Sequence, residues 1–358
     1  MPKYNIAVLF GGVSSEHEVS LLSATSVLQN LSKEKYDITC IGITKQGRWL
    51  FYPGPIEKIA TGEWENHPGC IDAIISPSRS HPGVLTFSSD GCCEERAIDC
   101  VFPVLHGKNG EDGTIQGLLA LSGIPFVGCD VLSSAVCMDK DITHRLLTTA
   151  GIRNANWVSL TTADLPLSEE TCLDIARKLG FPIFVKPANA GSSVGITKAQ
   201  TLSSLREGIR AAFAHDSKVV CEEMISGREI ECAVLGNDHP RASVLGEIIP
   251  CNDFYDYQAK YQSDSTLIAP AKLDEQLQRQ IQQTAVKAYL ALGCSGLARI
   301  DFFLTDQGEI YLNEPNTLPG FTVISMYPRL WAESGLPYQQ LLDTLINFAM
   351  EQQKDRIG

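Results

Sequence analysis

The chain has 358 residues, of which 44% are hydrophobic, and it is long enough for two or three domains with substantial cores. Its formal net charge of −13 argues against binding to nucleic acid or to an anionic membrane surface through general electrostatics. An anionic ligand would therefore need a local cluster of Lys, Arg and backbone NH groups. The sequence contains neither an apolar run of membrane-spanning length nor the pattern of a signal peptide.

The twelve cysteines are scattered and form no C-x-x-C pair, so neither a zinc site nor a redox motif is indicated. Most of them lie among apolar residues, and we expect these to behave as small buried hydrophobes. They include Cys40, Cys100, Cys129, Cys221, Cys232 and Cys294. Together with the charge, this pattern predicts a reduced, cytoplasmic, acidic globular protein.

The first predicted strand, Lys3–Phe10, is almost continuously apolar, which is typical of a buried parallel strand. Gly11-Gly12 then makes a turn into a helix. The G-x-G-x-x-G fingerprint is absent, which disfavours a nicotinamide cofactor. Ser15 and Glu18 match a capping box and predict the start of the helix. Glu16 falls in the first turn, where the helix dipole favours a carboxylate, so capping alone is one explanation of this residue.

A second strand is predicted over Asp37–Thr44 and a third, buried one over Ile98–Leu105. The intervening segment Lys45–Ala97 is rich in Gly, Pro, Ser and short alternating runs, and we interpret it as a peripheral β-rich insertion. The third strand ends at the loop His106–Gly113, which contains three glycines and precedes the helix Thr114–Ser122. Glycines at the carboxyl end of a strand indicate a place where backbone approaches a ligand.

The segment Asp130–Ala150 is predicted to be helical and contains Lys140, which would ordinarily be a solvated surface lysine. Further on, the strand Phe181–Lys186 ends at the loop Ala188–Gly195. The small residues of this loop form a flap whose NH and hydroxyl groups can cover phosphates, although such a loop is more often a plain turn. It is not a Walker A loop, because G-x-x-x-x-G-K-[ST] is missing.

Four more helices and three more strands follow from hydrophobic periodicity. The helices are Ser168–Leu179, Leu202–Phe213, Leu273–Leu292 and Pro337–Gln352, and the strands are Lys218–Glu223, Glu229–Leu235 and Ala242–Ile249. The segment 251–270 is aromatic and polar without periodicity, which is typical of an ordered loop over a site.

The segment Arg299–Asn316 predicts a β-hairpin, because two apolar runs flank a turn that contains glycine. Side chains alternate along a strand, so Arg299 shares a face with Asp301, and Glu314 shares a face with Asn316. If these faces coincide, two carboxylates and an amide oxygen converge, and such hard oxygen ligands suit Mg²⁺ held jointly by protein and nucleotide. A hairpin with a solvated polar face is the simpler explanation. Carboxylates inside apolar runs are costly unless paired or bound to metal, which favours the metal site.

Taken together, six motifs resemble the D-alanine–D-alanine ligase family of the ATP-grasp superfamily, across nearly the whole chain apart from 45–97. The motifs are Gly11–Ser20, His106–Gly113, Met138–Lys140, Lys186–Gly195, Phe254–Tyr261 and Glu314–Thr317. Each alone is weak evidence of kinship, but six in this order are specific.

The resemblance implies an α/β fold with an N-terminal parallel-sheet domain, 1–137, that carries the β-rich insertion at about 45–97. Two α+β lobes that clasp ATP are then expected at 138–222 and 223–358, the second with the metal site and the loop 251–270. The implied reaction joins two D-alanines through a D-alanyl phosphate and releases ADP and phosphate, for peptidoglycan precursor synthesis. A cytoplasmic homodimer without nucleic-acid or membrane partners is also implied.

By the same resemblance, residues of the two lobes would bind the nucleotide and its metal ions. The implied ATP-binding residues are Lys140, Lys186, Ser193, Glu222, Glu223, Met224, Ile225, Glu229 and Lys260. The implied ligands of two Mg²⁺ ions, which Mn²⁺ can replace, are Asp301, Glu314 and Asn316.

The implied substrate-binding and catalytic residues surround the two D-alanines. Glu16 would hold the ammonium group of the first D-alanine, with His106 nearby, and Arg299 and the NH of Gly320 would form the oxyanion site. The other implied residues are Ser325 and Met326, which would receive the second D-alanine's carboxylate, and Ser192 and Tyr261, which would close the flap and the loop over Glu16.

Two alternatives stay open. The first is a ligase of the same fold that uses D-lactate or D-serine as second substrate, and the second is a nucleotide-binding regulatory protein without catalysis. Lactate-using members of the family carry a His in the loop where Tyr261 stands, and no His occurs between Arg241 and Gly358, which favours D-alanine over D-lactate.

Overall fold

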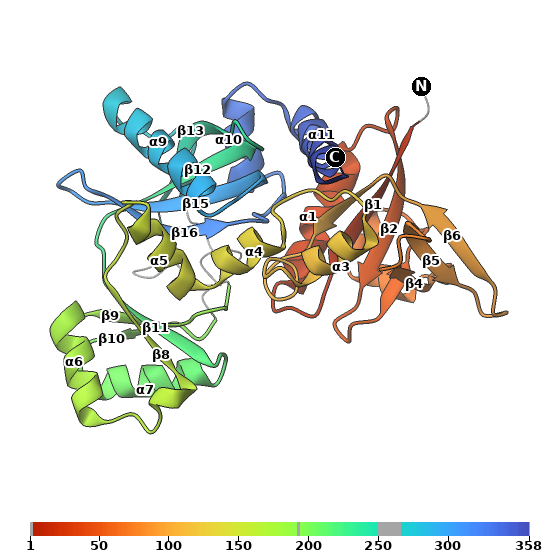
Figure 1. The fold of residues 1–358 in the computed structure, drawn as a ribbon. Helices are drawn as coiled ribbons and strands as arrows, with labels where there is room; N and C mark the ends of the chain where they lie inside the picture. The colour runs from red at the N-terminus through yellow and green to blue at the C-terminus, as the bar shows by residue number, and fades with distance from the viewer. Residues whose placement is uncertain (1–2, 192–193, 250–265, 358) are drawn as a thin grey trace.

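The structure, a computed structural model, describes residues 3–191, 194–249 and 266–357. A seven-stranded sheet lies in the first part of the chain, a four-stranded sheet in the middle and a five-stranded sheet in the last part, each with helices packed against it (Figure 1). This alternation of strands and helices agrees with the predicted α/β class. Within the described ranges, none of the helices combines the length and the apolar character needed to cross a membrane.

The first sheet has the strand order β6-β5-β4-β3-β2-β1-β7. Its strands are β1 (Tyr4–Gly11), β2 (Tyr36–Ile43), β3 (Trp49–Phe51), β4 (Ile71–Ile75), β5 (Gly83–Phe87), β6 (Cys93–Ala97) and β7 (Cys100–Val104). β1 pairs in parallel with β2 and β7, as its apolar run predicts. β3 to β6 pair antiparallel at one edge, so the segment predicted as a β-rich insertion extends the same sheet and also contains α2 (Glu57–Ala60) and η1 (Glu63–Asn66).

The first helix, α1 (His17–Asn30), begins differently from the prediction. The Ser15–Glu18 capping box is wrong, because the N-cap position is Glu16, whose NH donates to Ser14 Oγ at 3.1 Å, and Glu18 pairs with Lys45. The Glu16 side chain makes no capping hydrogen bond, so a hydrogen-bonded cap does not explain a carboxylate at this position. The helix α3 (Thr114–Ser122) has the predicted bounds.

The helix predicted over Asp130–Ala150 is two helices, α4 (Val131–Met138) and α5 (Lys140–Thr149). Asp139 between them has an extended backbone, and its carboxylate accepts hydrogen bonds from the NH groups at the start of α5. A side chain that caps the start of one helix competes with continuation of the helix before it. Asp139 therefore ends α4 and starts α5. As a result Lys140 stands at the start of a new helix rather than on a solvated face.

The middle sheet has the order β10-β9-β11-β8, and the last sheet has the order β14-β13-β12-β15-β16. The middle part comprises β8 (Trp157–Thr161), η2 (Thr162–Asp164), α6 (Glu169–Leu179), β9 (Ile183–Pro187), β10 (Thr197–Ala199), α7 (Leu202–Phe213) and β11 (Lys218–Glu223). The last part comprises β12 (Arg228–Gly236), β13 (Arg241–Ile249), β14 (Thr266–Ile268), α9 (Glu275–Ala291), β15 (Gly296–Leu304), β16 (Ile310–Asn316), α10 (Met326–Glu333) and α11 (Tyr338–Ile357).

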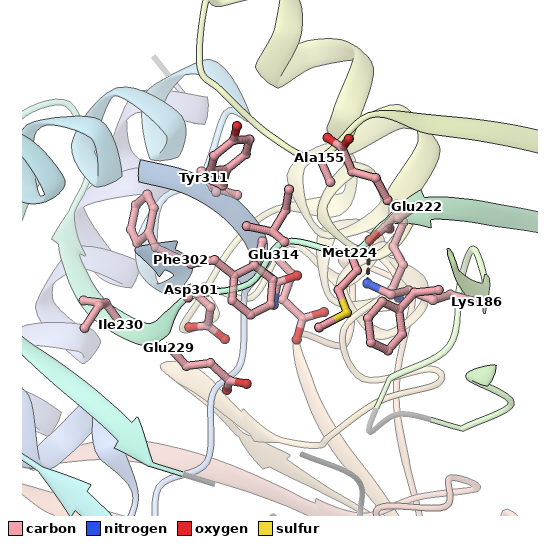
Figure 2. Close-up of a pocket in the computed structure, with 18 of the residues that line it drawn as sticks. Ala155, Lys186, Glu222, Met224, Glu229, Ile230, Asp301, Phe302, Tyr311 and Glu314 are labelled. Atoms are coloured by element: carbon pink, nitrogen blue, oxygen red, sulfur yellow. Dashed lines mark hydrogen bonds and ion pairs between the residues drawn. The ribbon is translucent and has the colours of Figure 1, made fainter. Parts of the chain in front are cut away.

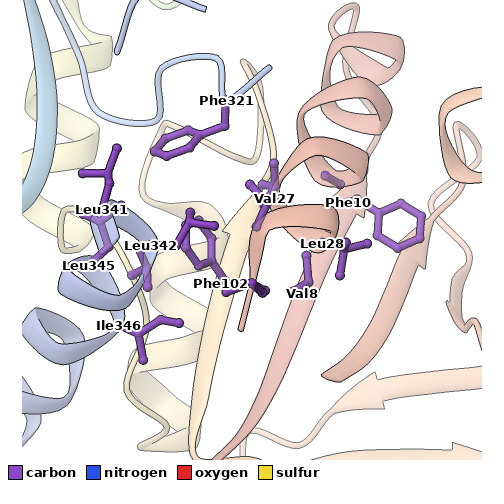
Figure 3. Close-up of a cluster of buried hydrophobic side chains, with 14 of the residues drawn as sticks. Val8, Phe10, Val27, Leu28, Phe102, Phe321, Leu341, Leu342, Leu345 and Ile346 are labelled. Atoms are coloured by element: carbon purple, nitrogen blue, oxygen red, sulfur yellow. The ribbon is translucent and has the colours of Figure 1, made fainter. Parts of the chain in front are cut away.

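The C-terminal helix α11 packs against the first sheet rather than only against its own lobe. One hydrophobic core joins residues of β1, α1 and β7 to residues of α10 and α11. Figure 3 shows this junction, whose labelled side chains include Val27 of α1, Phe102 of β7, Phe321 of the loop before α10, and Leu341, Leu342, Leu345 and Ile346 of α11. The first and last parts of the chain are therefore held together by shared burial of apolar surface.

The eleven cysteines in the part of the chain that the structure describes carry free thiols. Five of the six that were expected to be buried are so, while Cys40 is half-buried. Two of the buried cysteines meet where α4 packs against the loop after α9, and the sulfur atoms of Cys137 and Cys294 lie 3.6 Å apart there.

Candidate functional site

The hairpin of β15 and β16 brings the predicted metal-binding side chains together. Asp301 pairs with Glu314 and Arg299 pairs with Asn316 across the two strands, so the two polar faces coincide. A bulge lies directly after Asp301. Irregularities of this kind are common beside active sites because they redirect side chains.

Arg299 is held by carboxylates on two strands. Its Nε and Nη2 donate to the two oxygens of Asp301 at 2.8 and 2.7 Å, and its Nε lies 3.2 Å from Glu231 Oε1 on β12. Burial would lower the pKa of the guanidinium, but Asp301 and Glu231 hold the pKa of Arg299 well above its usual value. The guanidinium is thus a fixed positive charge with a fixed orientation.

Two cavities meet at this hairpin. One has a volume of about 320 Å³ and lies between the middle and last sheets, and the other, of about 490 Å³, lies between the last sheet and the first. Both are lined by Lys140, Lys186, Arg299 and Glu314. Two ligands in these cavities would therefore approach each other where cationic side chains and a carboxylate of the hairpin are available.

The smaller cavity is lined by all of the predicted ATP-binding residues that the structure describes. These are Lys140, Lys186, Glu222, Glu223, Met224, Ile225 and Glu229. Apolar side chains, including Ala155, Phe184, Phe302 and Tyr311, form the rest of its wall. Figure 2 shows Glu229 and Asp301 on one side of this cavity and the paired Lys186 and Glu222 on the other. A flat aromatic base with a charged tail would match an apolar wall that leads to lysines.

Glu222, which is buried on β11, is contacted by the side chains of Lys186 and His144. Its Oε2 lies 2.6 Å from Lys186 Nζ, and its Oε1 lies 3.1 Å from His144 Nε2. Burial alone would raise the pKa of the Glu222 carboxyl, but Lys186 and His144 hold it well below its ordinary value. Glu222 is therefore a buried carboxylate rather than a carboxylic acid.

The larger cavity is lined by the predicted substrate-binding residues. Glu16, His106, Gly320, Ser325 and Met326 come from the first and last parts of the chain. The Ser325 hydroxyl accepts from the Thr322 NH at 3.0 Å and would lie 2.9 Å from a Cβ at Gly320, so no side chain fits at that glycine without a shift. Gly320 therefore lines the cavity with backbone alone, directly beside Ser325.

Glu16 is surrounded by glycine backbone. A Cβ on Gly107 would lie 2.3 Å from Glu16 Oε2, and a Cβ on Gly191 would lie 3.1 Å from the same atom. Gly107 also has φ +68°, which side chains rarely adopt. The glycine loop after β7 and the start of the predicted flap therefore both reach the Glu16 carboxylate. Lys140 Nζ donates to Ala190 O at 2.8 Å, which fixes the flap from the other side.

His106 is buried beside the loop that carries Gly320. Its Nδ1 lies 3.0 Å from Leu318 O and its Nε2 lies 3.0 Å from the Ser23 hydroxyl, which also accepts from the Phe321 NH at 3.3 Å. Burial would lower the pKa of His106, but Glu111, at 3.6 Å, outweighs it and raises this pKa. His106 therefore connects α1 to the loop on both sides of Gly320.

Four of the predicted site residues lie outside the described residues. They are Ser192 and Ser193 of the flap, and Lys260 and Tyr261 of the loop 251–270. Their predicted roles stay predictions.

The donor set at the hairpin is chemically suited to Mg²⁺, because it offers carboxylate and amide oxygens and no sulfur or imidazole. Among the described residues there is no cluster of three or more His, Cys, Asp or Glu side chains that could hold a metal ion alone. The hairpin supplies two carboxylates, and Asp301 Oδ2 also accepts from Asn316 Nδ2 at 2.9 Å. Further ligands of such an ion would come from nucleotide phosphates and water.

Two residues of the site, Glu231 and His144, were not predicted from the sequence. Glu231 lies opposite Asp301 on the neighbouring strand, and both Glu231 and His144 line both cavities. Glu231 had a visible signal, since it shares a strand face with Glu229 two residues earlier. No such signal pointed to His144, because the side toward which its side chain projects depends on the break between α4 and α5.

Comparisons with known proteins agree with this geometry. The family models described as "D-ala D-ala ligase N-terminus" and "D-ala D-ala ligase C-terminus" match residues 5–129 and 146–347. The chain is 50% identical to the D-alanine–D-alanine ligase of Acetivibrio thermocellus, over 99% of this chain and 98% of that protein. It is also 50% identical to the ligase of the same name from Thermoanaerobacter sp., over 99% of both proteins.

Two solved structures are similar over nearly the whole chain. The VanG D-Ala:D-Ser ligase from Enterococcus faecalis has a TM-score of 0.89 and 44% identity, covering 97% of this chain and 100% of that one. The D-alanine–D-alanine ligase from Coxiella burnetii has a TM-score of 0.86 and 36% identity, covering 100% of this chain and 97% of that one.

Proposed function

The chain belongs to the D-alanine–D-alanine ligase family, with its ATP-grasp fold, and from that premise we propose that it joins two D-alanines to D-alanyl-D-alanine for peptidoglycan precursor synthesis. ATP is the co-substrate, and ADP and phosphate are released. Curated relatives at about 50% identity across the whole chain support this assignment.

The observation that carries the proposal is the meeting of two cavities at Arg299 and Glu314. A carboxylate does not react with an amine, so the first D-alanine must be activated by phosphoryl transfer. Such a transfer requires the nucleotide and the amino acid to lie in adjoining sites with positive charge between them. The shared wall of the two cavities provides this arrangement.

In the smaller cavity, the apolar wall and the backbone near Glu223 hold adenine, and Glu229 binds the ribose hydroxyls. Lys140 and Lys186 bind the phosphates, with Ser193 and Lys260 as further contacts. Asp301, Glu314 and Asn316 are the residues that would hold two Mg²⁺ ions, or Mn²⁺, together with the phosphates. When bound, these ions offset the charge of the transferred phosphoryl group.

In the larger cavity, Glu16 binds the ammonium group of the first D-alanine, since its carboxylate is enclosed by the glycine loops. Arg299 and the Gly320 NH stabilise the oxyanion that forms when the second D-alanine attacks the acyl phosphate. Ser325 and Met326 bind the second D-alanine's carboxylate.

Ser192 and Tyr261 close the flap and the loop over Glu16, so that water does not hydrolyse the acyl phosphate.

The division of the chain into domains at 1–137, 138–222 and 223–358 is part of the same proposal, as are a homodimer and a cytoplasmic location. Free thiols at the described cysteines support a reducing compartment.

A second candidate function is ligation of D-alanine to D-serine. It is favoured by one observation, the similarity to the VanG D-Ala:D-Ser ligase. D-Serine keeps the ammonium group of D-alanine and adds only a hydroxyl, which an apolar pocket rejects weakly.

The test is phosphate release from ATP in the presence of Mg²⁺, with and without D-alanine. We expect release that depends on D-alanine and is not supported by L-alanine. Binding of ATP without such release would overturn the proposal and would favour a non-catalytic nucleotide-binding protein.

A further inference from the structure

His144 is a buried histidine of α5 with polar partners on both ring nitrogens. Nε2 lies 3.1 Å from Glu222 Oε1, and Nδ1 lies 2.9 Å from Asn154 Oδ1. The ring also stacks on Trp157, with centroids 4.8 Å apart and an interplanar angle of 17°. These contacts fix the position of the ring on the wall shared by both cavities.

Both ring nitrogens of His144 face acceptors. Asn154 Nδ2 donates to Ile152 O at 3.1 Å, and a carbonyl oxygen can only accept, so the amide oxygen of Asn154 is the atom that faces Nδ1. Glu222 is ionised, so it accepts from Nε2. Between two acceptors, both ring nitrogens of a histidine can donate only in its positively charged imidazolium form. Stacking on an indole ring favours that charge.

Glu222 is thus shared between two cations, one on each of its oxygens (Lys186 and His144). Figure 2 shows that Lys186 points at Glu222 in this structure. If nucleotide phosphates bind in the proposed site, they would compete with Glu222 for the Lys186 ammonium and could draw it away. A carboxylate that is 6% exposed would then be left without that partner, and an unpaired buried charge is strongly destabilising.

We propose that His144 is a positioning residue for nucleotide binding, whose positive charge keeps Glu222 paired when Lys186 turns to the phosphates. This inference rests on the proposed use of ATP. Without His144, Glu222 would retain Lys186, and the phosphates would lose a cation. The adenosine part of the nucleotide would be affected much less, because it does not need the lysine to move.

The experiment compares ADP and adenosine binding by calorimetry in the wild type and in His144→Gln. We expect ADP affinity to fall by about tenfold or more, as for loss of a hydrogen bond to a charged group, with less than about threefold change for adenosine. His144→Lys, which restores a positive charge, should recover most of the ADP affinity. The matched control is His81→Gln, because His81 also pairs with a glutamate, at 2.9 Å from Glu95, but is exposed and far along the first sheet.

Equal losses for ADP and adenosine in His144→Gln would overturn the inference, since a merely structural residue would affect both. Full ADP affinity in that variant would overturn it as well. If His144→Gln does not fold, Asn154→Leu replaces it in the test, because this variant keeps the imidazole and its stacking but removes one acceptor. It should lower the affinity for ADP and not that for adenosine. An unchanged affinity for ADP in Asn154→Leu would count against the inference. If the wild type itself does not bind ADP, the proposed function fails rather than this assignment alone.

Discussion

Arg299, which lines both cavities, and Asp301, which lines the smaller one, form a two-point ion pair on β15 with nitrogen–oxygen distances of 2.8 and 2.7 Å. The same carboxylate is a proposed metal ligand, and the same guanidinium is a proposed oxyanion donor. The two roles are therefore coupled through a fixed geometry, which only a planar, forked side chain can provide.

Arg299→Lys should lower kcat by about 100-fold or more, because the ammonium keeps the charge but cannot hold both oxygens of Asp301 and the oxyanion together. Steady-state kinetics with D-alanine and ATP measures this effect. Thermal unfolding of the same variant serves as control for folding. A kcat within about threefold of wild type would remove Arg299 from the oxyanion site.

Glu314→Gln should abolish turnover while the protein still folds. Glu314 is one of the residues that would hold the metal ions, so loss of its charge should disturb phosphoryl transfer much more than stability. The measurement is D-alanine-dependent phosphate release. Activity within about tenfold of wild type, or about 1.4 kcal/mol of transition-state stabilisation, would remove Glu314 from the metal site.

Gly107→Ala should raise the KM for D-alanine by about tenfold or more, because the new Cβ would lie 2.3 Å from Glu16 Oε2 and displace the proposed ammonium-binding carboxylate. Gly293→Ala is the matched control. Gly293 has φ +70°, against +68° at Gly107, but no atom within 4 Å of a new Cβ. Both variants should lose about 1–2 kcal/mol of stability from backbone strain. A KM for D-alanine equal to that of the wild type in Gly107→Ala would show that this loop takes no part in substrate binding.

Leu342→Ala should destabilise the protein by about 2–5 kcal/mol, since Leu342 is fully buried in the core that joins α11 to the first sheet. Asn347→Ala, on the exposed side of the same helix, should change stability by less than about 0.5 kcal/mol. Chemical denaturation measures both. Equal stabilities of the two variants would contradict the docking of α11.

Local patterns predicted the hairpin site well. Alternation along β15 and β16 determines which side chains share a face, so the convergence of Asp301 with Glu314 could be predicted from nearby residues alone. The predicted capping box at Ser15 is wrong because the N-cap position lies one residue later, at Glu16. The Glu16 side chain does not cap the helix and instead lines the larger cavity. Local pattern alone does not decide between two adjacent capping arrangements.

Long-range contacts were not predictable in this way. Glu231 reaches Arg299 only because β12 lies beside β15. Similarly, α11 packs near Phe102 of β7, although most of the sequence separates them. The helix α10 was missed because Pro328 lies within it, although a proline in the first helical turn costs no hydrogen bond. These features depend on tertiary packing, which sequence periodicity does not encode.

The most direct test of the central claim is the product formed from ATP, D-alanine and an equal concentration of D-lactate at neutral pH, identified by mass spectrometry alongside released phosphate. We predict D-alanyl-D-alanine almost alone, with one phosphate released for each dipeptide. A parallel reaction with D-serine measures how strongly the second site rejects a hydroxyl. Mainly depsipeptide, mainly the D-serine product, or phosphate release without any ligated product would contradict the assignment.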